Sequence, residues 1–388
     1  MPQLALLTLN SGSSSLKFGL FLAERAEIRP AYLGAVEGIG STGGKLWMRS
    51  AAGQDIYHGE HAISMQADAV DLVADKLRDL SVPTPAAIGH RLVHGGPALR
   101  EHQRITPQVL QQLESAAHFA PLHVPVALSL ITAAQARFPN VPEFACFDTS
   151  FHRTLPEVAA RLPLPETFWK AGVRRYGFHG LSCESVLHTL GPDVPPRLIV
   201  AHLGNGASLT AIANGRSVDT TMGLTPTGGV IMGTRTGDLD PGVLLHILRT
   251  TGSNPDQLEH LLDKESGLLG ISGISNDMRQ VHQASANPQA QLAIDMFCQS
   301  VKKAIAAFIA VLEGLDLLVF TGGIGEHDPA ARASICKGLH PLGIALDPSS
   351  NQSNLSTISA ANSAARVSII PADEESQIAR LTHRLLKP

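Results

Sequence analysis

The sequence predicts an α/β protein made of two duplicated domains, with a phosphate-binding site in the cleft between them. A strand, a turn of small residues and a second strand occur at 4–21 and again at 198–214. Apolar runs typical of buried strands alternate with segments of helical periodicity. A chain of 388 residues, 44% of them hydrophobic, suffices for two domains with separate cores. Turns of this kind can direct backbone N–H groups at a phosphate, so a nucleotide is the predicted ligand.

The first half of the chain is predicted to alternate strands and helices. The elements after the hairpin are a helix in 62–80, a strand at 86–93, a helix at 106–119 and a strand at 142–147. Thr106 is the expected N-cap of its helix, and Pro107 stands at the first helical position. Arg91 lies near the end of one buried strand, before a Gly-Gly-Pro turn, and Asp148 follows another.

The second half repeats the plan and adds a long polar tract. The predicted elements are the hairpin at 198–214, a helix at 289–313, a strand at 315–320, a surface loop at 348–364 and a helix at 374–386. The strand at 315–320 stops in glycines before a helix, which is a nucleotide-contact geometry. The tract at 220–242 is rich in glycine and threonine, so it is either a disordered linker or an active-site loop.

Composition limits the partners and the compartment. The net charge of −4 comes without any block of Lys or Arg, so we expect neither a nucleic-acid nor a membrane partner. No signal peptide is recognisable, so a cytoplasmic location is expected. The four cysteines are scattered and are interpreted as reduced packing residues. We expect an N-terminal domain of residues 1–149 plus about 375–388, on the acceptor and phosphate side, and a C-terminal domain of 150–374 on the nucleotide side.

No complete P-loop or G-x-G-x-x-G motif occurs, so a phosphate site would be assembled from several turns. The turn after Asn10 could be an ordinary hairpin loop, but its second copy and Lys17 favour phosphate binding. Arg91 and Arg235 could each form a surface ion pair. Because both lie in turns bounded by glycines, we favour guanidinium groups that donate bidentate hydrogen bonds to an anion.

Carboxylates and histidines offer further candidates, each with a plainer alternative. Asp148 is either a turn former or a group that orients a substrate carboxylate or a metal-bound water. Glu374 either offsets a helix dipole or supplies a hard oxygen ligand for magnesium. His123, His179 and His202 lie in loops bounded by Pro or Gly, and we expect at least one of them to donate a hydrogen bond to a phosphoryl group.

Seven motifs, in order along the chain, resemble those of acetate kinases. They are Asn10-Ser-Gly-Ser-Ser-Ser-Leu-Lys17, His90-Arg-Leu-Val-His-Gly-Gly96, Phe147-Asp-Thr-Ser-Phe-His152, Arg175-Tyr-Gly-Phe-His-Gly180, His202-Leu-Gly-Asn-Gly206, Gly233-Thr-Arg-Thr-Gly-Asp-Leu-Asp-Pro241 and Phe320-Thr-Gly-Gly-Ile-Gly-Glu326. That family belongs to the acetate and sugar kinase, Hsp70 and actin superfamily. The resemblance implies two duplicated ribonuclease-H-like domains (the actin-like ATPase fold), ATP and Mg²⁺ in the cleft, and a homodimer.

The resemblance also implies a role for individual residues. Asn10 and Glu374 match magnesium positions. The positions that match ATP contacts are Lys17, His202, Leu203, Gly204, Asn205, Gly206, Asp277, Met278, Arg279, Gly323, Ile324, Gly325, Glu326 and His327. The positions that match acceptor and phosphoryl contacts are Arg91, His123 and the apolar pocket of Val93, Leu122, Phe178 and Pro226. Asp148 matches the acid/base residue, and His179 and Arg235 match the stabilisers of the transition state.

The implied reaction is a reversible, direct in-line transfer of the ATP γ-phosphate to acetate, with Mg²⁺ (or Mn²⁺ as a substitute), giving acetyl phosphate and ADP. A carboxylate acceptor is ionised at neutral pH and needs no strong base, so Asp148 is better interpreted as orienting than as abstracting. The branched Val93 favours acetate over longer acids. Propionate kinase is the alternative within the class, and an actin- or Hsp70-type ATPase is the alternative from another class.

Two places depart from the motifs of the family. Ala372-Asp373 stands where Thr-Asn is common before the metal glutamate, which adds negative charge beside Glu374. His327 replaces the usual Asn after Gly325-Glu326, at the expected adenosine end, so the preference for ATP over GTP stays open.

Overall fold

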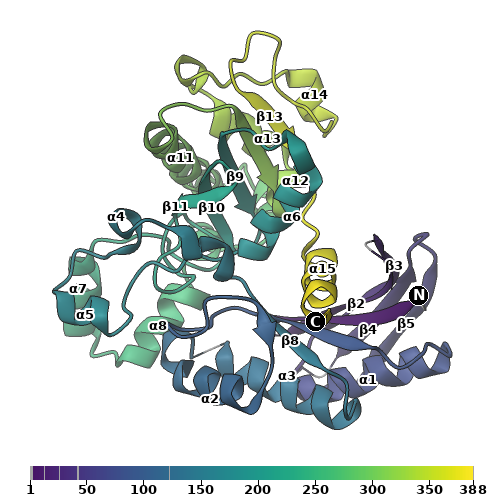
Figure 1. Cartoon of the computed structure of the whole chain (residues 1–388). Coiled ribbons are helices and arrows are strands. Elements are labelled where there is room, and N and C mark those ends of the chain that lie inside the picture. The colour runs from purple at the N-terminus through teal and green to yellow at the C-terminus, as the bar shows by residue number, and fades with distance from the viewer. Residues whose placement is uncertain (1–2, 13, 26, 42, 122, 388) are drawn as a thin grey trace. The chain divides into compact units, whose positions relative to one another are not determined.

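The computed structural model describes residues 3–12, 14–25, 27–41, 43–121 and 123–387, and it has a mixed α/β architecture (Figure 1). Contacts divide the chain into two compact units. Unit 1 comprises Met1–Ser150, Gly180–Ser185 and Asp373–Pro388, and unit 2 comprises Phe151–His179 and Val186–Ala372. The short segment Gly180–Ser185, which groups with unit 1, was not part of the expected N-terminal domain. The functional division of the chain stays a prediction.

Unit 1 is built on an eight-stranded sheet of order β5-β4-β3-β2-β1-β6-β8-β7. The strands are β1 (Leu4–Ser11), β2 (Ser15–Glu24), β3 (Glu27–Glu37), β4 (Gly44–Ser50), β5 (Asp55–His61), β6 (Ala87–Leu92), β7 (Gln103–Arg104) and β8 (Glu143–Phe147). Strands β1, β6 and β8 run parallel, and Asn10 on β1 pairs with Arg91 on β6. Their carboxyl ends therefore meet at one edge of the sheet, where open α/β sheets bind ligands.

Helices cover both faces of this sheet. The helices of unit 1 are α1 (Gln66–Asp79), α2 (Pro107–Ser115), α3 (Val124–Arg137) and α15 (Glu374–Leu386), with a 3-10 turn at Ala117–Phe119. Leu7 and Leu9 pack in a core with α1 and α3, whereas Leu6 packs in a core with Ala379 of α15. Side chains alternate along a strand, so Asn10 lies on the α15 face with Leu6.

Helix α15 approaches the sheet closely because β6 has a glycine beneath it. A Cβ atom added at Gly89 would lie 2.1 Å from Oγ1 of the buried Thr382 on α15. Any larger residue at Gly89 would push the helix outward, and with it the glutamates of its first turn. The glycine thus helps to set the distance between α15 and the strand that carries Arg91.

Unit 2 is built on a five-stranded sheet of order β11-β10-β9-β12-β13. The strands are β9 (Arg197–Leu203), β10 (Ala207–Ala213), β11 (Arg216–Thr220), β12 (Leu317–Thr321) and β13 (Arg366–Ile369). The other helices are α4 (Glu157–Ala160), α5 (Glu166–Lys170), α6 (Gly180–Leu190), α7 (Pro241–Thr251), α8 (Pro255–Lys264), α9 (Gly267–Ser272), α10 (Met278–Gln283), α11 (Pro288–Val311), α12 (Gly322–His327), α13 (Pro329–Cys336) and α14 (Pro348–Gln352), with 3-10 turns at Ser150–Thr154, Gly191–Asp193 and His340–Leu342. Strand β12 pairs in parallel with β9, and Thr321 lies beside His202.

Most elements predicted from local signals are confirmed. Both hairpins form, as β1–β2 and β9–β10. Thr106 caps α2 by accepting a hydrogen bond from the N–H of Val109, with Pro107 at the start of the helix. All four cysteines are free and buried, as expected of packing residues.

The predicted surface loop at 348–364 is wrong in part. The segment begins with α14, and both Asn351 and Ile358 are buried. The reason is Arg332, whose side chain is 0% exposed and whose guanidinium donates to the Oδ1 and the backbone oxygen of Asn351 and to the backbone oxygen of Gly325. A buried guanidinium needs such acceptors, so the segment folds against α13 rather than lying in solvent.

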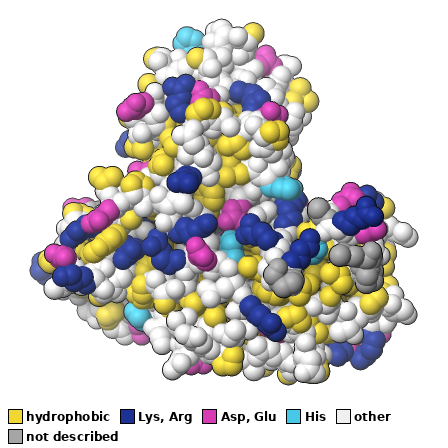
Figure 2. All heavy atoms as spheres, viewed as in Figure 1, with side chains coloured by type: hydrophobic (Ala, Val, Ile, Leu, Met, Phe, Trp, Pro, Cys, Tyr) yellow, Lys and Arg dark blue, Asp and Glu magenta, His cyan; other side chains and the backbone are white. Residues whose placement is uncertain are grey.

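The surface shows no segregation of charge on the face drawn in Figure 2, where lysine and arginine side chains are interspersed with acidic and hydrophobic ones. This pattern agrees with the near-balance of 30 basic and 34 acidic residues. Among the described residues, no helix is long and apolar enough to cross a membrane.

Candidate functional site

Three predicted site residues meet at the carboxyl ends of β1, β6 and β8 in unit 1. Arg91 donates from Nε (2.9 Å) and Nη2 (2.5 Å) to Oδ2 of Asp148, and from Nη1 (3.2 Å) to Oδ1 of Asn10. The Asp148 side chain is fully buried, while that of Arg91 is 18% exposed. Asp148 and Asn10 thus hold the guanidinium of Arg91 in place, and solvent can still reach it.

Helix α15 brings two carboxylates to the same place. Nδ2 of Asn10 donates to Oε2 of Glu374 (3.3 Å) and to Oε1 of Glu375 (3.1 Å). Lys17 pairs with Asn10 across the hairpin, and its charge acts on Glu375. Glu375 is a further candidate residue of this cluster, and the sequence analysis missed it. The signal was present in the run Asp373-Glu374-Glu375, but nothing in the sequence indicated which of these acids faces Asn10.

Burial and crowding of charge shift the pKa values in this cluster. Burial raises the pKa of Asp148 to about 6, with Arg91 opposing the shift and Glu374 adding to it. Burial and the neighbouring charge of Glu374 raise the pKa of Glu375. Burial alone would lower the pKa of Arg91, but Asp148 and Glu374 outweigh it, so the pKa is raised and the group stays charged. The cluster holds more negative than positive side chains and would be stabilised by a cation.

These residues fit a magnesium ion. Among the described residues, no group of three or more His, Cys, Asp or Glu side chains forms a closed metal cage. Mg²⁺ rarely needs one, because it keeps several waters and binds through one or two carboxylates together with substrate phosphates. Asn10 and Glu374 offer the hard oxygen donors that such a site requires. Glu375, whose carboxyl is crowded by Glu374, is a third candidate donor.

The raised pKa of Asp148 leads to a prediction about pH. Below about pH 6 the carboxyl binds a proton and Arg91 loses its ionic partner, so we expect kcat/KM to fall on that side. The folded state binds this proton more tightly than the unfolded chain, whose pKa is near the ordinary 3.8, so the contribution of Asp148 to folding stability decreases as pH rises through this window. A pH profile of wild type and Asp148→Asn checks the assignment. An acid limb that persists in the variant would contradict it.

A second group of predicted residues gathers in unit 2, around the turn between β9 and β10. Nδ1 of His179 lies 2.9 Å from Oγ of Ser208, and the His179 ring stacks on that of His202 with centroids 4.2 Å apart. A Cβ atom added at Gly206 would lie 3.3 Å from both Nη1 of Arg235 and Nε2 of His179. A larger residue at Gly206 would therefore press on the side chains of both Arg235 and His179.

His179 also has an unusual backbone. It precedes α6 in the left-handed region, with a φ of 55°, which is uncommon for residues with a side chain. Arg235 comes from the tract at 220–242, and its Nη1 donates to the backbone oxygen of Pro226 (3.1 Å). The tract is thus ordered around a half-buried arginine, which is expected of an active-site loop and not of a disordered linker.

The predicted ATP segments lie at the carboxyl ends of β9 and β12 and at the start of α10. Oδ1 of Asn205 accepts from Nδ2 of Asn276 (3.1 Å), which ties His202–Gly206 to the residues before Asp277. Asp277 caps α10 and pairs with the exposed Arg279. Leu203 is buried beside the turn, and Met278 is buried in α10.

The turn after β12 is held by one of the predicted ATP contacts. Oε1 of Glu326 accepts from the N–H of Gly322 (2.8 Å) and of Ala372 (2.9 Å). Gly322 has a φ of 77°, and this conformation places Gly323, Ile324 and Gly325 in the short helix α12. Glu326 thus supports the turn, whereas His327 has 76% of its side chain exposed.

The residues predicted for the acyl pocket belong partly to unit 1 and partly to unit 2. Val93 is half-buried in unit 1, and His123 precedes α3 in the same unit. Phe178 and Pro226 are buried in unit 2. Leu122 lies outside the described residues.

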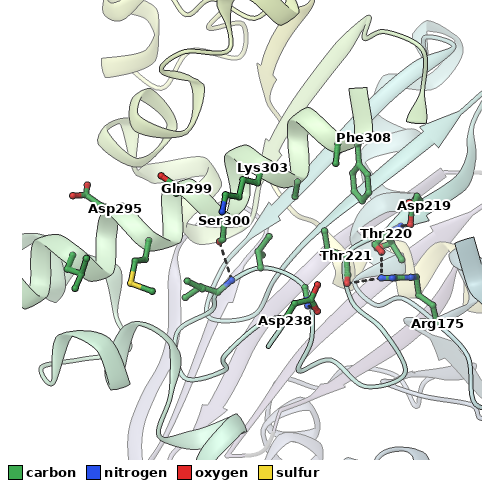
Figure 3. A pocket seen from close by; sticks show the side chains of 17 residues that line it. Arg175, Asp219, Thr220, Thr221, Asp238, Asp295, Gln299, Ser300, Lys303 and Phe308 are labelled. Carbon is green, nitrogen blue, oxygen red and sulfur yellow. Dashed lines mark hydrogen bonds between the residues drawn. The ribbon is translucent and has the colours of Figure 1, made fainter. Parts of the chain in front are cut away.

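Unit 2 also carries a groove of about 770 Å³ between α11 and the end of β11 (Figure 3). Arg175 at its wall donates to the backbone oxygens of Thr220 and Thr221, and the N–H of Ile231 donates to Ser300. Exposed Leu292 and Met296 line the same groove. None of the predicted site residues lines it.

Comparisons with known proteins identify the family of the chain. The model of the acetokinase family matches residues 5–380. Propionate kinase of Citrobacter rodentium is 41% identical over 392 residues, covering 98% of this chain and 96% of the relative. Acetate kinase of Nitrobacter hamburgensis is 43% identical over 391 residues, with the same two coverages of 98% and 96%. The crystal structure of a propionate kinase from Francisella tularensis has a TM-score of 0.91 at 36% identity, over 98% of this chain and 100% of that one. This likeness confirms the predicted actin-like ATPase fold.

Proposed function

Because the chain belongs to the acetokinase family, and is therefore a kinase that acts on a carboxylate, we propose that it is an acetate kinase that transfers the γ-phosphate of ATP reversibly to acetate. The observation that carries this proposal is Arg91, held by Asp148 and Asn10 beside two glutamates. A guanidinium has five N–H groups, and the bonds to Asp148 and Asn10 use three. Among the described residues the other two have no partner, and they suit a bidentate anion.

The proposed chemistry needs no base. An oxygen of acetate, already ionised at neutral pH, attacks the γ-phosphorus in line while the bond to the bridging oxygen of ADP breaks and ADP keeps the electron pair. Arg91 would hold the acetate and the phosphoryl oxygens, and Asp148 would orient Arg91. His179 and Arg235 would donate to the phosphoryl oxygens as negative charge spreads over them.

Asn10 and Glu374 are the proposed magnesium positions, with Glu375 as a further candidate. A bound Mg²⁺ would neutralise charge on the transferred phosphate. The amide of Asn10 connects both glutamates to Arg91, so the residues that would hold the ion are linked to the residue that would hold the acceptor. The segments around His202, Asp277 and Gly323 are the proposed contacts for ATP.

The choice between acetate and propionate depends on the acyl pocket. The family includes proteins named for each acid. Half-buried Val93 has a branched side chain, and we expect it to restrict the space beyond the methyl group of acetate. One extra methylene is worth about 1 to 3 kcal/mol, so acetate should exceed propionate in kcat/KM by about 5- to 150-fold. Initial rates of ADP formation with acetate, propionate and butyrate test this. Higher kcat/KM for propionate would make the protein a propionate kinase.

The proposed assembly is a homodimer, and unit 2 offers a surface for it. Helix α7 is apolar on average but has no buried residue, and Leu245 is 50% exposed. Leu292 and Met296 on α11 are exposed as well. A second copy of the chain would cover such side chains.

Sedimentation analysis tests this surface. We expect wild type to sediment as a dimer and Leu245→Glu or Met296→Glu to shift it toward a monomer. Leu355→Glu is a matched control, because Leu355 is 52% exposed but lies outside the groove. A monomeric wild type, or dimers in every variant, would contradict the assignment.

A further inference from the structure

Three polar side chains form a hydrogen-bonded network in unit 1, close to the proposed site residues of that unit. His102, Glu184 and Gln377 come from the loop before β7, from α6 and from α15. Nε2 of His102 lies 3.0 Å from Oε1 of Glu184, and Nε2 of Gln377 donates to Oε2 of Glu184 over 2.9 Å. The side chains of His102 and Glu184 are only 6% and 16% exposed. No sequence motif pointed to any of the three.

Neighbouring groups fix the protonation states of the side chains in this network. The N–H of Phe147 donates to Nδ1 of His102 (3.0 Å), so Nδ1 carries no proton and Nε2–H is the donor to Glu184. Burial favours the neutral form of Glu184, but the hydrogen bonds from His102 and Gln377, together with the nearby charge of Arg384, outweigh it and lower the pKa. Glu184 is therefore a buried carboxylate that accepts from His102 and Gln377.

Each end of the network of His102, Glu184 and Gln377 is next to a proposed site residue. Phe147 immediately precedes Asp148, and Gln377 lies one helical turn after Glu374 on α15. The first residue of α6, Gly180, also donates its N–H to the backbone oxygen of Asp148 (2.9 Å). The start of α6 thus contacts both the strand end that presents Asp148 and the helix that presents Glu374.

We propose that Glu184 is a positioning residue, which fixes the distance between Asp148 and Glu374 through His102 and Gln377. This inference rests on the roles proposed above for Asp148 and Glu374. A buried carboxylate of this kind contributes little net stability, because the cost of desolvation offsets its hydrogen bonds. Its effect is on geometry, since a fully satisfied buried network restrains the elements that it joins. Outer residues that orient metal ligands typically change metal affinity or activity by about 10- to 100-fold.

The test compares Glu184→Ala, Glu184→Gln and Gln377→Ala in the full-length enzyme. We expect Glu184→Ala and Gln377→Ala to lower kcat by about 10-fold or more and to weaken Mn²⁺ binding in the presence of ADP by a similar factor, measured by electron paramagnetic resonance. Glu184→Gln keeps the shape and an acceptor oxygen for His102, and its NH2 group can donate to Gln377 once the Gln377 amide turns over, so it should recover part of both quantities. Gln377→Ala removes the hydrogen bond between α15 and Glu184. It tests the positioning role even if Glu184→Ala does not fold.

Leu77→Ala is the control for stability. Leu77 is 4% exposed and packs in the core of α1 and α3, on the sheet face opposite α15. We expect it to lower Tm while kcat and Mn²⁺ affinity stay close to wild type. If Glu184→Ala and Gln377→Ala behave like Leu77→Ala, Glu184 is merely structural and the inference is overturned.

Two further variants separate this inference from the proposed function. Asp148→Asn and Glu374→Gln act on the proposed site residues directly. If both keep full activity, the proposed site is wrong. If both are impaired while Glu184→Ala and Gln377→Ala match wild type, only the positioning role fails.

Discussion

Replacing Arg91 by alanine is expected to lower kcat by at least about 10³-fold, equivalent to about 4 kcal/mol of barrier. The variant loses the two N–H groups proposed to hold the anion. It also frees Asn10, which accepts from Arg91 and bridges to both glutamates. Steady-state rates of ADP formation with saturating acetate and ATP measure the effect. Arg91→Lys should recover only part of the activity, because an ammonium group is a point charge and cannot form the two parallel hydrogen bonds that a guanidinium donates to an anion.

The same change should also destabilise the fold, because Asp148 is left buried without its cationic partner. Breaking a buried pair costs about 3 to 5 kcal/mol, reduced here because the carboxyl of Asp148 can bind a proton. Rates are therefore compared well below the Tm of the variant. Arg197→Ala is the matched control, since its pair with Asp316 is 43% and 28% exposed and should contribute little to stability. Wild-type kcat in folded Arg91→Ala would contradict the proposed site.

Replacing Arg235 by alanine is expected to lower kcat by about 10²- to 10³-fold while the KM values change little. The guanidinium would act on charge that develops only as the phosphoryl group moves, so its loss affects kcat more than binding. The variant also loses the hydrogen bond from Nη1 of Arg235 to the backbone oxygen of Pro226, so its Tm is measured beside its rates.

Arg216→Ala provides the comparison for Arg235→Ala. Arg216 is an exposed arginine at the start of β11 in the same unit. It should keep wild-type kcat and Tm. Unchanged acyl phosphate formation in Arg235→Ala would remove this residue from the proposed site.

Local signals in the sequence were sufficient to predict many elements of the fold. Thr106-Pro107 marked the start of α2 because capping depends on a few adjacent residues. The hairpins were visible because continuous apolar runs flank short turns of small residues. Long-range packing was not visible. The burial of Asn351 depends on Arg332, 19 residues away, and no local pattern in the polar segment indicates that partner.

The candidate site was predictable to the extent that its residues end strands. Asn10, Arg91 and Asp148 each stand at or next to the carboxyl end of a strand, and parallel strands bring those ends together. The face of α15 could not be predicted, so Glu375 was missed. Glu184 lies within an ordinary helix, and its partners are 82 and 193 residues away in sequence. Only the folded chain brings them together.

The identity of the product tests the central claim most directly. Wild type and Arg91→Ala are incubated with ATP, Mg²⁺, acetate and hydroxylamine, and acetyl hydroxamate and ADP are measured together. We predict that wild type forms one acetyl hydroxamate per ADP and that folded Arg91→Ala forms neither at a comparable rate. ADP without hydroxamate from the wild-type protein, or equal hydroxamate from both proteins, would contradict a carboxylate kinase site built on Arg91.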